Sequence, residues 1–329
     1  MELQIGFCTN PDGARIAYGT MGQGPEWVIP PGYSASITPI NTIPEIRKNV
    51  SHFAPYHTLV FYDQVGAGLS DRNRTVFTLE SELQDLETVI NHLNLDPVIL
   101  KGQAMSGPVA IAYAAKYPER VTHLILYGTS VYYGKYVPDE VKAAMLSLIR
   151  QPDNWLGRRA MLSLYASQAQ IETLELLVAM TKDIATPEVL ANLMDMSYKL
   201  DVRHLCPLIK APTLVMHRKG DPLYDFKAGL ELASLIPNAR FVPLEGDMHF
   251  YVWGDTESFE RNEHEFLGDP LPNKADDNAA KVASLSLVAE PKPEQKKLDW
   301  LRVDNPLVYI IVTIVASVIA GAILTLFKC

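Results

Sequence analysis

The sequence predicts an α/β fold: a mostly parallel sheet covered by helices, with a helical cap and one C-terminal transmembrane helix. Residues 1–267 alternate short apolar runs with amphipathic stretches, which is typical of parallel strands enclosed between helices. Residues 131–206 carry several helical patterns and no strand pattern, which indicates an inserted cap. Residues 307–327 form an uncharged apolar run that is long enough to cross a bilayer.

An antiparallel hairpin is predicted at the start of the chain. Its strands, residues 5–9 and 15–19, flank Pro11-Asp12-Gly13. The proline presets φ and the glycine accepts a positive φ, as a tight turn requires. Parallel strands are predicted next, because the following runs are mostly apolar, as strands buried on both faces are. These runs are residues 27–30, 58–62, 98–101, 124–127, 213–217 and 240–243.

Helix-start signals fall between these strands, so helices are expected on both faces of the sheet. Thr78 precedes Glu80 and Glu82, an N-cap followed by acids that suit the helix dipole. Thr186-Pro187-Glu188, in the predicted cap, combines an N-cap, a first-turn proline and an acid. The helix after Thr78 has one apolar face, formed by Leu83, Leu86, Val89, Ile90 and Leu93.

Composition excludes several classes of protein. With 329 residues, 48% hydrophobic and 20% charged, the chain suits a large globular domain. A net charge of −9 without a basic face argues against nucleic acid as a partner. Cys8, Cys206 and Cys329 are too widely spaced for a zinc site or a disulfide framework, which favours a reducing compartment. Gly66-Ala67-Gly68 lacks the lysine of a phosphate-binding loop, so we expect neither metal nor cofactor.

The C-terminal end predicts a membrane anchor that runs from Leu307 to Phe327. Its 21 residues carry no charge, and as a helix they would extend about 31 Å, roughly one hydrocarbon core. Small residues recur on one face, which permits close helix packing, so a homo-oligomer formed through this helix is one expectation. The small or weakly polar residues are Thr313, Ser317, Gly321 and Thr325.

The topology of this anchor places the main domain in the cytoplasm. Three basic residues (Lys296, Lys297 and Arg302) precede the apolar run, against Lys328 after it, which is a positive-inside bias. The first ten residues lack the basic and apolar regions of a secretory signal. The chain is therefore expected to comprise a main domain, a flexible linker spanning about 30 Å, and a juxtamembrane segment with its anchor. These parts are residues 1–267, 268–299 and 300–329.

Residues 97–127 have the pattern of a nucleophile elbow. A strand ends at Gly102 and a helix of small residues begins by Gly107, and small residues let strand and helix approach closely. Over about residues 5–267 the chain resembles the α/β-hydrolase family, most closely capped bacterial domains of the kind also fused to nucleotide cyclases and regulators. Further matches are Asp12-Gly13-x-Arg15-Ile16-Ala17-Tyr18, Pro31-Gly32-Tyr33, Asp63-x-x-Gly66-x-Gly68-x-Ser70-Asp71 and Tyr117-Pro118-Glu119-Arg120-Val121.

The nucleophile position of the resembled motif, G-x-S-x-G, is occupied by Ala104. A methyl group has neither a proton to transfer nor a lone pair to attack a carbonyl. Taking Ser106 as the nucleophile instead would start the helix two residues late. Ser106 is more simply an N-terminal cap or a packing residue. The chain as written is therefore expected not to form an acyl-enzyme.

The remaining triad positions are filled, in the order that the resemblance implies. Asp221 follows a predicted strand and His249 lies in the loop after the last one, so Asp221 would orient His249 and His249 would be the general base. Asp225 is a nearby competitor for the acid. The other histidines are expected at the surface or at helix ends, for example His52, His57, His92, His123 and His264.

Main-chain donors are expected to remain in an oxyanion hole. In the resembled family they would be the N–H groups of Tyr33, after Pro31-Gly32, and of Met105. Such a pocket can hold an ester, acyl or carbonyl ligand without turning it over.

Two functions remain open from the sequence. One is a membrane-tethered pseudoenzyme that binds a small acyl or ester ligand as a regulatory module. The other is an esterase-like or lipase-like serine hydrolase whose native serine at position 104 has been replaced. The initiating Met and the absence of tag residues resemble an unmodified reading frame, which favours the first, and the filled Asp221 and His249 positions favour the second. The residue encoded natively at position 104 would separate them.

Overall fold

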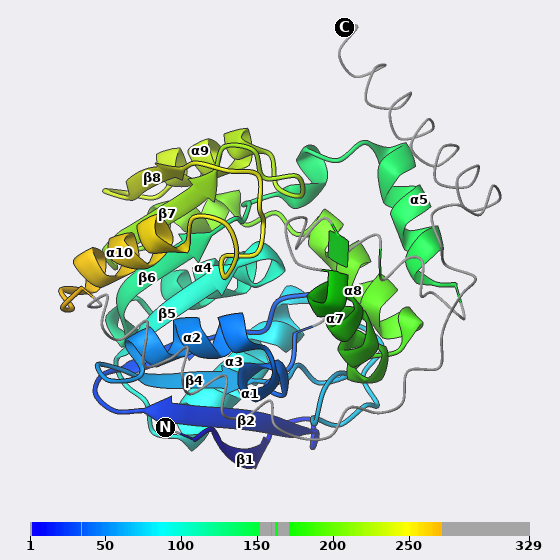
Figure 1. Ribbon diagram of the computed structural model, residues 1–329, viewed down its shortest axis with the longest axis horizontal. Coiled ribbons are helices and arrows are strands. Elements are labelled where there is room, and N and C mark those ends of the chain that lie inside the picture. Colours follow the sequence, from blue (N-terminus) through cyan, green and yellow to red (C-terminus); the bar gives the residue numbers. More distant parts are fainter. Residues whose placement is uncertain (1, 34, 152–158, 160–161, 164–170, 272–329) are drawn as a thin grey trace, which may run out of the picture. The chain divides into compact units, whose positions relative to one another are not determined.

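The computed structural model describes residues 2–33, 35–151, 159, 162–163 and 171–271. An eight-stranded sheet with the order β1-β2-β4-β3-β5-β6-β7-β8 lies at its centre (Figure 1). β1, β2 and β4 pair antiparallel, and all pairs from β4 through β3 to β8 are parallel. The predicted α/β class with a mostly parallel sheet is confirmed. The strands are β1 (Gln4–Thr9), β2 (Arg15–Gly22), β3 (Glu26–Ile29), β4 (Thr58–Tyr62), β5 (Val98–Gln103), β6 (Val121–Tyr127), β7 (Thr213–Arg218) and β8 (Arg240–Leu244).

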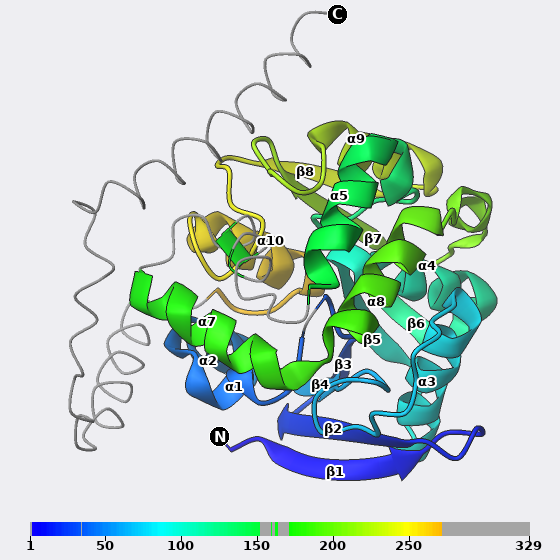
Figure 2. The ribbon, with the colours of Figure 1, turned by 90° about the vertical axis from the view of Figure 1, so that its right-hand side faces the viewer.

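Helices cover both faces of this sheet. Figure 2 shows α3 and α4 on one side and α1, α2 and α10 on the other. Ile90 of α3 and Ala110 of α4 pack in one apolar core with Leu100 of the sheet. Phe53 of α2 and Phe259 of α10 pack in a second core with Trp27. The helices are α1 (Pro39–Thr42), α2 (Pro44–Phe53), α3 (Leu79–His92), α4 (Gly107–Lys116), α9 (Phe226–Leu235) and α10 (Thr256–Leu267).

The described part of residues 131–206 is helical and contains no strand. It includes α5 (Asp139–Ile149), α7 (Ile171–Ile184) and α8 (Pro187–Lys199). Thr186 caps α8 as its sequence predicts, because its side chain accepts a hydrogen bond from the Val189 amide at 3.3 Å. Apolar residues of these helices form a third core that includes Met105 and Phe77 of the main domain.

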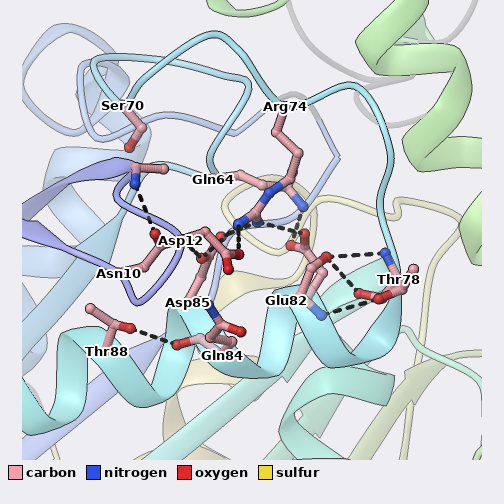
Figure 3. A network of polar contacts seen from close by, with 12 residues as sticks. Asn10, Asp12, Gln64, Ser70, Arg74, Thr78, Glu82, Gln84, Asp85 and Thr88 are labelled. Atoms are coloured by element: carbon pink, nitrogen blue, oxygen red, sulfur yellow. Dashed lines mark hydrogen bonds and ion pairs between the residues drawn. The ribbon is translucent and has the colours of Figure 1, made fainter.

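A buried polar cluster holds the N-terminal hairpin against α3 (Figure 3). We call Asn10, Gln64, Arg74, Glu82 and Asp85 the Arg74 cluster. Arg74 donates two hydrogen bonds to Asp85, which also accepts one from Asn10 at 2.8 Å. Gln64 donates to Glu82, whose other carboxyl oxygen lies 3.7 Å from Arg74 Nη1. Burial, with the neighbouring charge of Asp85, raises the pKa of Glu82 to about 8.

One prediction about the histidines needs correction, and the predicted membrane anchor lies outside the described residues. His52 and His264 lie in the last turns of α2 and α10, as expected of helix-end residues, and both are buried. His57 is the correction, because it lies between α2 and β4 and is buried rather than exposed. His52 pairs with Glu260 and His57 with Asp269, each at 2.7 Å. Within the described residues, no helix is both long and apolar enough to cross a membrane. The predicted anchor at 307–327 and most of the predicted linker lie outside the described residues.

Candidate active site

The turn after β5 has the backbone of a nucleophile elbow. Ala104 takes φ 48°, a left-handed conformation that is rare for a residue with a side chain. The strand and α4 pass so closely that a Cβ on Gly102 would lie 2.8 Å from the Cβ of Ala110. A Cβ on Gly107 would lie 2.1 Å from Thr129 Oγ1, and this hydroxyl donates to the carbonyl of Ala104. The neighbours of Ala104 therefore impose the strained turn.

Ser106 closes this turn. Its hydroxyl accepts from the Gln103 amide at 3.0 Å and donates to the Gln103 carbonyl at 2.9 Å. The side chain is buried. Ser106 thus serves the local backbone, in keeping with its expected capping role, and position 104 is the residue at the apex of the elbow.

Asp221 and His249 form a buried pair. Asp221 follows β7, and its Oδ2 accepts from His249 Nδ1 at 2.8 Å. Its Oδ1 accepts from the amides of Leu223 and Tyr224 at 2.9 and 3.0 Å. Burial acts to raise the pKa of Asp221, but the charge and hydrogen bond of His249 and the Tyr224 amide outweigh it and lower the pKa. The acid stays ionised and holds the imidazole by Nδ1, so proton transfer toward a ligand would involve Nε2.

Asp225 does not join this pair. Its side chain caps α9 by accepting from the Lys227 amide at 2.8 Å. Of the two acids that the sequence offers near position 221, only Asp221 is within hydrogen-bond distance of His249 in the structure.

Three residues that the sequence did not single out support the pair. A Cβ on Gly128, which has φ 52°, would lie 3.1 Å from the His249 ring, so glycine allows the close approach of the strand end. His217 lies with Nε2 3.8 Å from Asp221 and 2.8 Å from the Tyr224 carbonyl. Burial lowers the pKa of His217 despite the charge of Asp221, so it contributes geometry rather than charge.

The third residue, Arg218, fastens the loop that carries His249. It is fully buried at the end of β7. Its guanidinium donates to the carbonyls of Met248 at 3.2 Å and of Trp253 at 2.7 Å. Both ends of the segment around His249 are therefore tied to the strand that precedes Asp221. A buried arginine bonded to carbonyls leaves no local signal in the sequence beyond its unusual place in an apolar strand.

A cavity of about 170 Å³ opens beside the elbow. Ala104, Tyr33 and His249 all line it, together with mainly aliphatic and aromatic side chains. Met105, the other predicted oxyanion residue, follows Ala104 in the same turn, and its side chain packs against the third core. The cavity's lining residues with polar side-chain atoms are Tyr33, Ser36, Tyr62, Gln103, Tyr127, Thr181, His249, Tyr251 and Trp253. In the part of the chain that the structure describes, no group of His, Cys, Asp and Glu is arranged to hold a metal ion.

Known proteins are similar to this chain. A hydrolase from Paraburkholderia phymatum, named for 2-hydroxy-6-oxononadienedioate and the corresponding trienedioate, is 27% identical over 270 residues, which are 77% of this chain and 91% of that protein. An esterase from Exiguobacterium antarcticum matches with a TM-score of 0.72 at 21% identity, over 80% of this chain and 99% of that one. The enol-lactonase of Burkholderia xenovorans LB400 matches with a TM-score of 0.68 at 21% identity, over 80% and 100%.

A family model described as serine aminopeptidase, S33, matches residues 55–250. The match covers more than half of the chain and includes the elbow, Asp221 and His249. The solved neighbours share the same fold. The chain therefore belongs to this serine aminopeptidase family, and its fold is that of the α/β-hydrolases.

Proposed function

We propose that the chain is a membrane-tethered α/β-hydrolase-fold protein that binds an ester, acyl or carbonyl ligand without turning it over. One observation carries this proposal: alanine stands at the apex of an intact elbow, beside a cavity that His249 also lines. Removing a triad nucleophile lowers kcat by up to about 10⁶. Binding depends on other parts of the site, namely the apolar cavity and the main-chain donors of Tyr33 and Met105.

A serine hydrolase is the second candidate, with Ala104 standing in place of a native serine. The geometry of the acid and base favours it, because Asp221 and His249 are hydrogen bonded at 2.8 Å and buried together. A protein with no use for a general base has no need of this pair.

Labelling with a fluorophosphonate probe tests the assignment of the elbow and the second candidate. The chain as written is expected not to react, and Ala104→Ser is expected to react because His249 then has a nucleophile to activate. The control variant combines Ala104→Ser with His249→Ala and should stay unlabelled. Labelling of the unaltered chain at Ser106 would contradict the assignment of the elbow. Failure of Ala104→Ser to react would rule out the second candidate and support the binding function.

Ligand binding is tested by thermal shift. Fatty acids and small esters should raise the melting temperature by mass action. Two variants that block the cavity, Ala104→Trp and Ile40→Trp, should abolish the shift, and circular dichroism would verify that they fold. If no compound of a broad acyl library shifted the unaltered protein, the cavity would be a structural void and the binding function would be wrong.

The tether is a separate part of the proposal. Residues 307–327 would anchor the protein in the bilayer with the main domain in the cytoplasm. Deleting residues 298–329 should release a folded domain from membranes, and a truncated protein that still pelleted would contradict a sole anchor. Replacing Ser317 and Gly321 with Ile should lower crosslinking of the full-length protein if the anchor self-associates.

A further inference from the structure

We infer that the cavity selects a ligand whose body beyond the carbonyl group is uncharged, and that it excludes dicarboxylates of the kind named for the Paraburkholderia relative. This inference rests on the proposed binding function. It concerns the far end of the ligand, away from the elbow, and it follows from where the charges around the cavity are placed.

Among the residues that the structure describes, the lining supplies no charged partner. None of the described residues that line the cavity is a lysine, arginine, aspartate or glutamate. The lining includes aliphatic side chains such as Ile40 and Ile184 and aromatic ones such as Tyr251 and Trp253. A carboxylate buried against such walls loses its hydration without gaining a counter-charge.

His249 does not provide the missing cation. Its Nδ1 is held by Asp221 at 2.8 Å, and the pKa of Asp221 is lowered, so the carboxylate is ionised at neutral pH. A protonated His249 is therefore already balanced. The positive end of α4 and the expected main-chain donors all lie at the elbow. They favour one carbonyl or carboxylate oxygen there, and the described residues at the far end add no positive charge.

Two buried cations of the described residues, Lys101 and Arg218, are occupied elsewhere. Lys101 pairs with Glu263 at 2.7 Å and lies 4.5 Å from the ring of Tyr251, whereas Tyr251 itself lines the cavity. Arg218 is bonded to the carbonyls of Met248 and Trp253. Neither cation is among the lining residues, so neither is available to a second carboxylate of a ligand.

The volume of the cavity also favours a small ligand. A cavity of about 170 Å³ is close to the roughly 150 Å³ that accommodates benzene in an engineered apolar cavity. A small ester or lactone with a short aliphatic or aromatic substituent fits these walls. A ligand with a second charged group would have to bury it or keep it outside the cavity.

A matched pair of ligands tests the inference: methyl hexanoate and monomethyl adipate, which differ in a carboxylate at the far end. Calorimetric titration of the full chain in nanodiscs, with Ile40→Trp as the blank for partitioning into lipid, should give at least about tenfold tighter binding of methyl hexanoate. Thr181→Lys, which adds a cation to the lining, should shift the ratio of the two dissociation constants by about tenfold toward the adipate. Ile40→Lys is a second variant for the same purpose, should the first not fold.

The outcomes separate this inference from the function on which it rests. Binding of neither ligand would overturn the binding function and this inference with it. Equal or tighter binding of monomethyl adipate to the unaltered chain would overturn the charge selection alone, since it would show that the site binds esters but tolerates a second charge. An unchanged ratio in both lysine variants would likewise contradict it.

Discussion

The Arg74 cluster and the Asp221–His249 pair both bury carboxylates, but they do so with opposite consequences. Glu82 and Asp85 face a permanent cation, and burial raises the pKa of each. Asp221 faces an imidazole, and its pKa is lowered. The Arg74 cluster is absent from the lining of the large cavity, whereas His249 lines it.

The difference lies in the partner of the acid. Arginine is charged at every accessible pH, so Arg74 is a fixed cation that does not itself exchange protons. Histidine gains and loses its proton near neutral pH, which lets a carboxylate beside it support chemistry. A buried acid is therefore informative about function only together with its partner and its access to a cavity.

The largest effect is expected from removing Asp221, the acid of the Asp221–His249 pair. In the Ala104→Ser background, Asp221→Asn should lower the rate of fluorophosphonate labelling by about 10⁴, because the imidazole would no longer be held in the correct tautomer. Asp225→Asn is the matched control and should leave the rate unchanged, since Asp225 only caps α9. Equal rates for the two variants would show that Asp221 does not orient the base.

In the Arg74 cluster, Arg74→Met should lower the free energy of unfolding by about 3–5 kcal/mol, measured in urea, because it leaves buried carboxylates without their cation. The increase in melting temperature that ligands cause should be unchanged in the folded variant. Lys210→Met, which breaks an exposed pair with Glu119 at 3.0 Å, should have little effect. A small effect of Arg74→Met would mean that the cluster is not what holds the hairpin.

The pH dependence of stability gives a smaller effect. The pKa of Glu82 is raised to about 8, so between about pH 4.5 and 8 the folded chain holds a proton that the unfolded chain releases. Folding stability from this group is thus present at low pH and is lost as pH rises through that window. Glu82→Gln should raise the free energy of unfolding by about 1–3 kcal/mol relative to the unaltered chain between pH 5 and 8. Parallel stability curves for the two proteins would exclude this account.

The smallest effect concerns the start of α3. Thr78 accepts from the Ser81 amide at 3.1 Å and forms a capping box with it. Thr78→Ala should lower the free energy of unfolding by about 1 kcal/mol. Thr88→Ala, in the middle of the same helix, should not destabilise, since alanine is the better helix former. Similar losses for both would point to side-chain packing rather than capping.

Most of the fold could be predicted because its signals are local. The apolar run at 58–62 coincides with β4, and Thr78 and Thr186 cap helices as their spacing predicts. The predicted strand at 98–101 was too short, because β5 continues to Gln103. The two missed residues, Gly102 and Gln103, give no local strand signal, and they belong to the strand because they pair with Leu126 and Tyr127 of β6.

The residues of the site likewise fall into those that local patterns locate and those that they do not. The motif and the chain order locate Ala104, Asp221 and His249, because strand ends and the turns after them leave local patterns. Gly128 and Arg218 could not be located from local patterns. Gly128 matters because it lies against His249, more than a hundred residues later in the chain, and Arg218 matters because it donates to a carbonyl of the loop after β8. The burial of His57 was missed for the same reason: its acid partner follows α10.

The end of α10 also determines how the domain would bear mechanical load. Gly268 ends the helix in a left-handed conformation, and Asp269 then pairs with His57 at 2.7 Å. His57 directly precedes β4, whose opposite end, Tyr62, lines the cavity. A pull on the chain beyond residue 271 would reach the sheet at the start of β4, and the four steps from Thr58 to Tyr62 span about 13 Å along the strand. The ion pair would give that load a second route into the sheet, through His57 and β4, beside the covalent route along α10 toward the loop that holds His249.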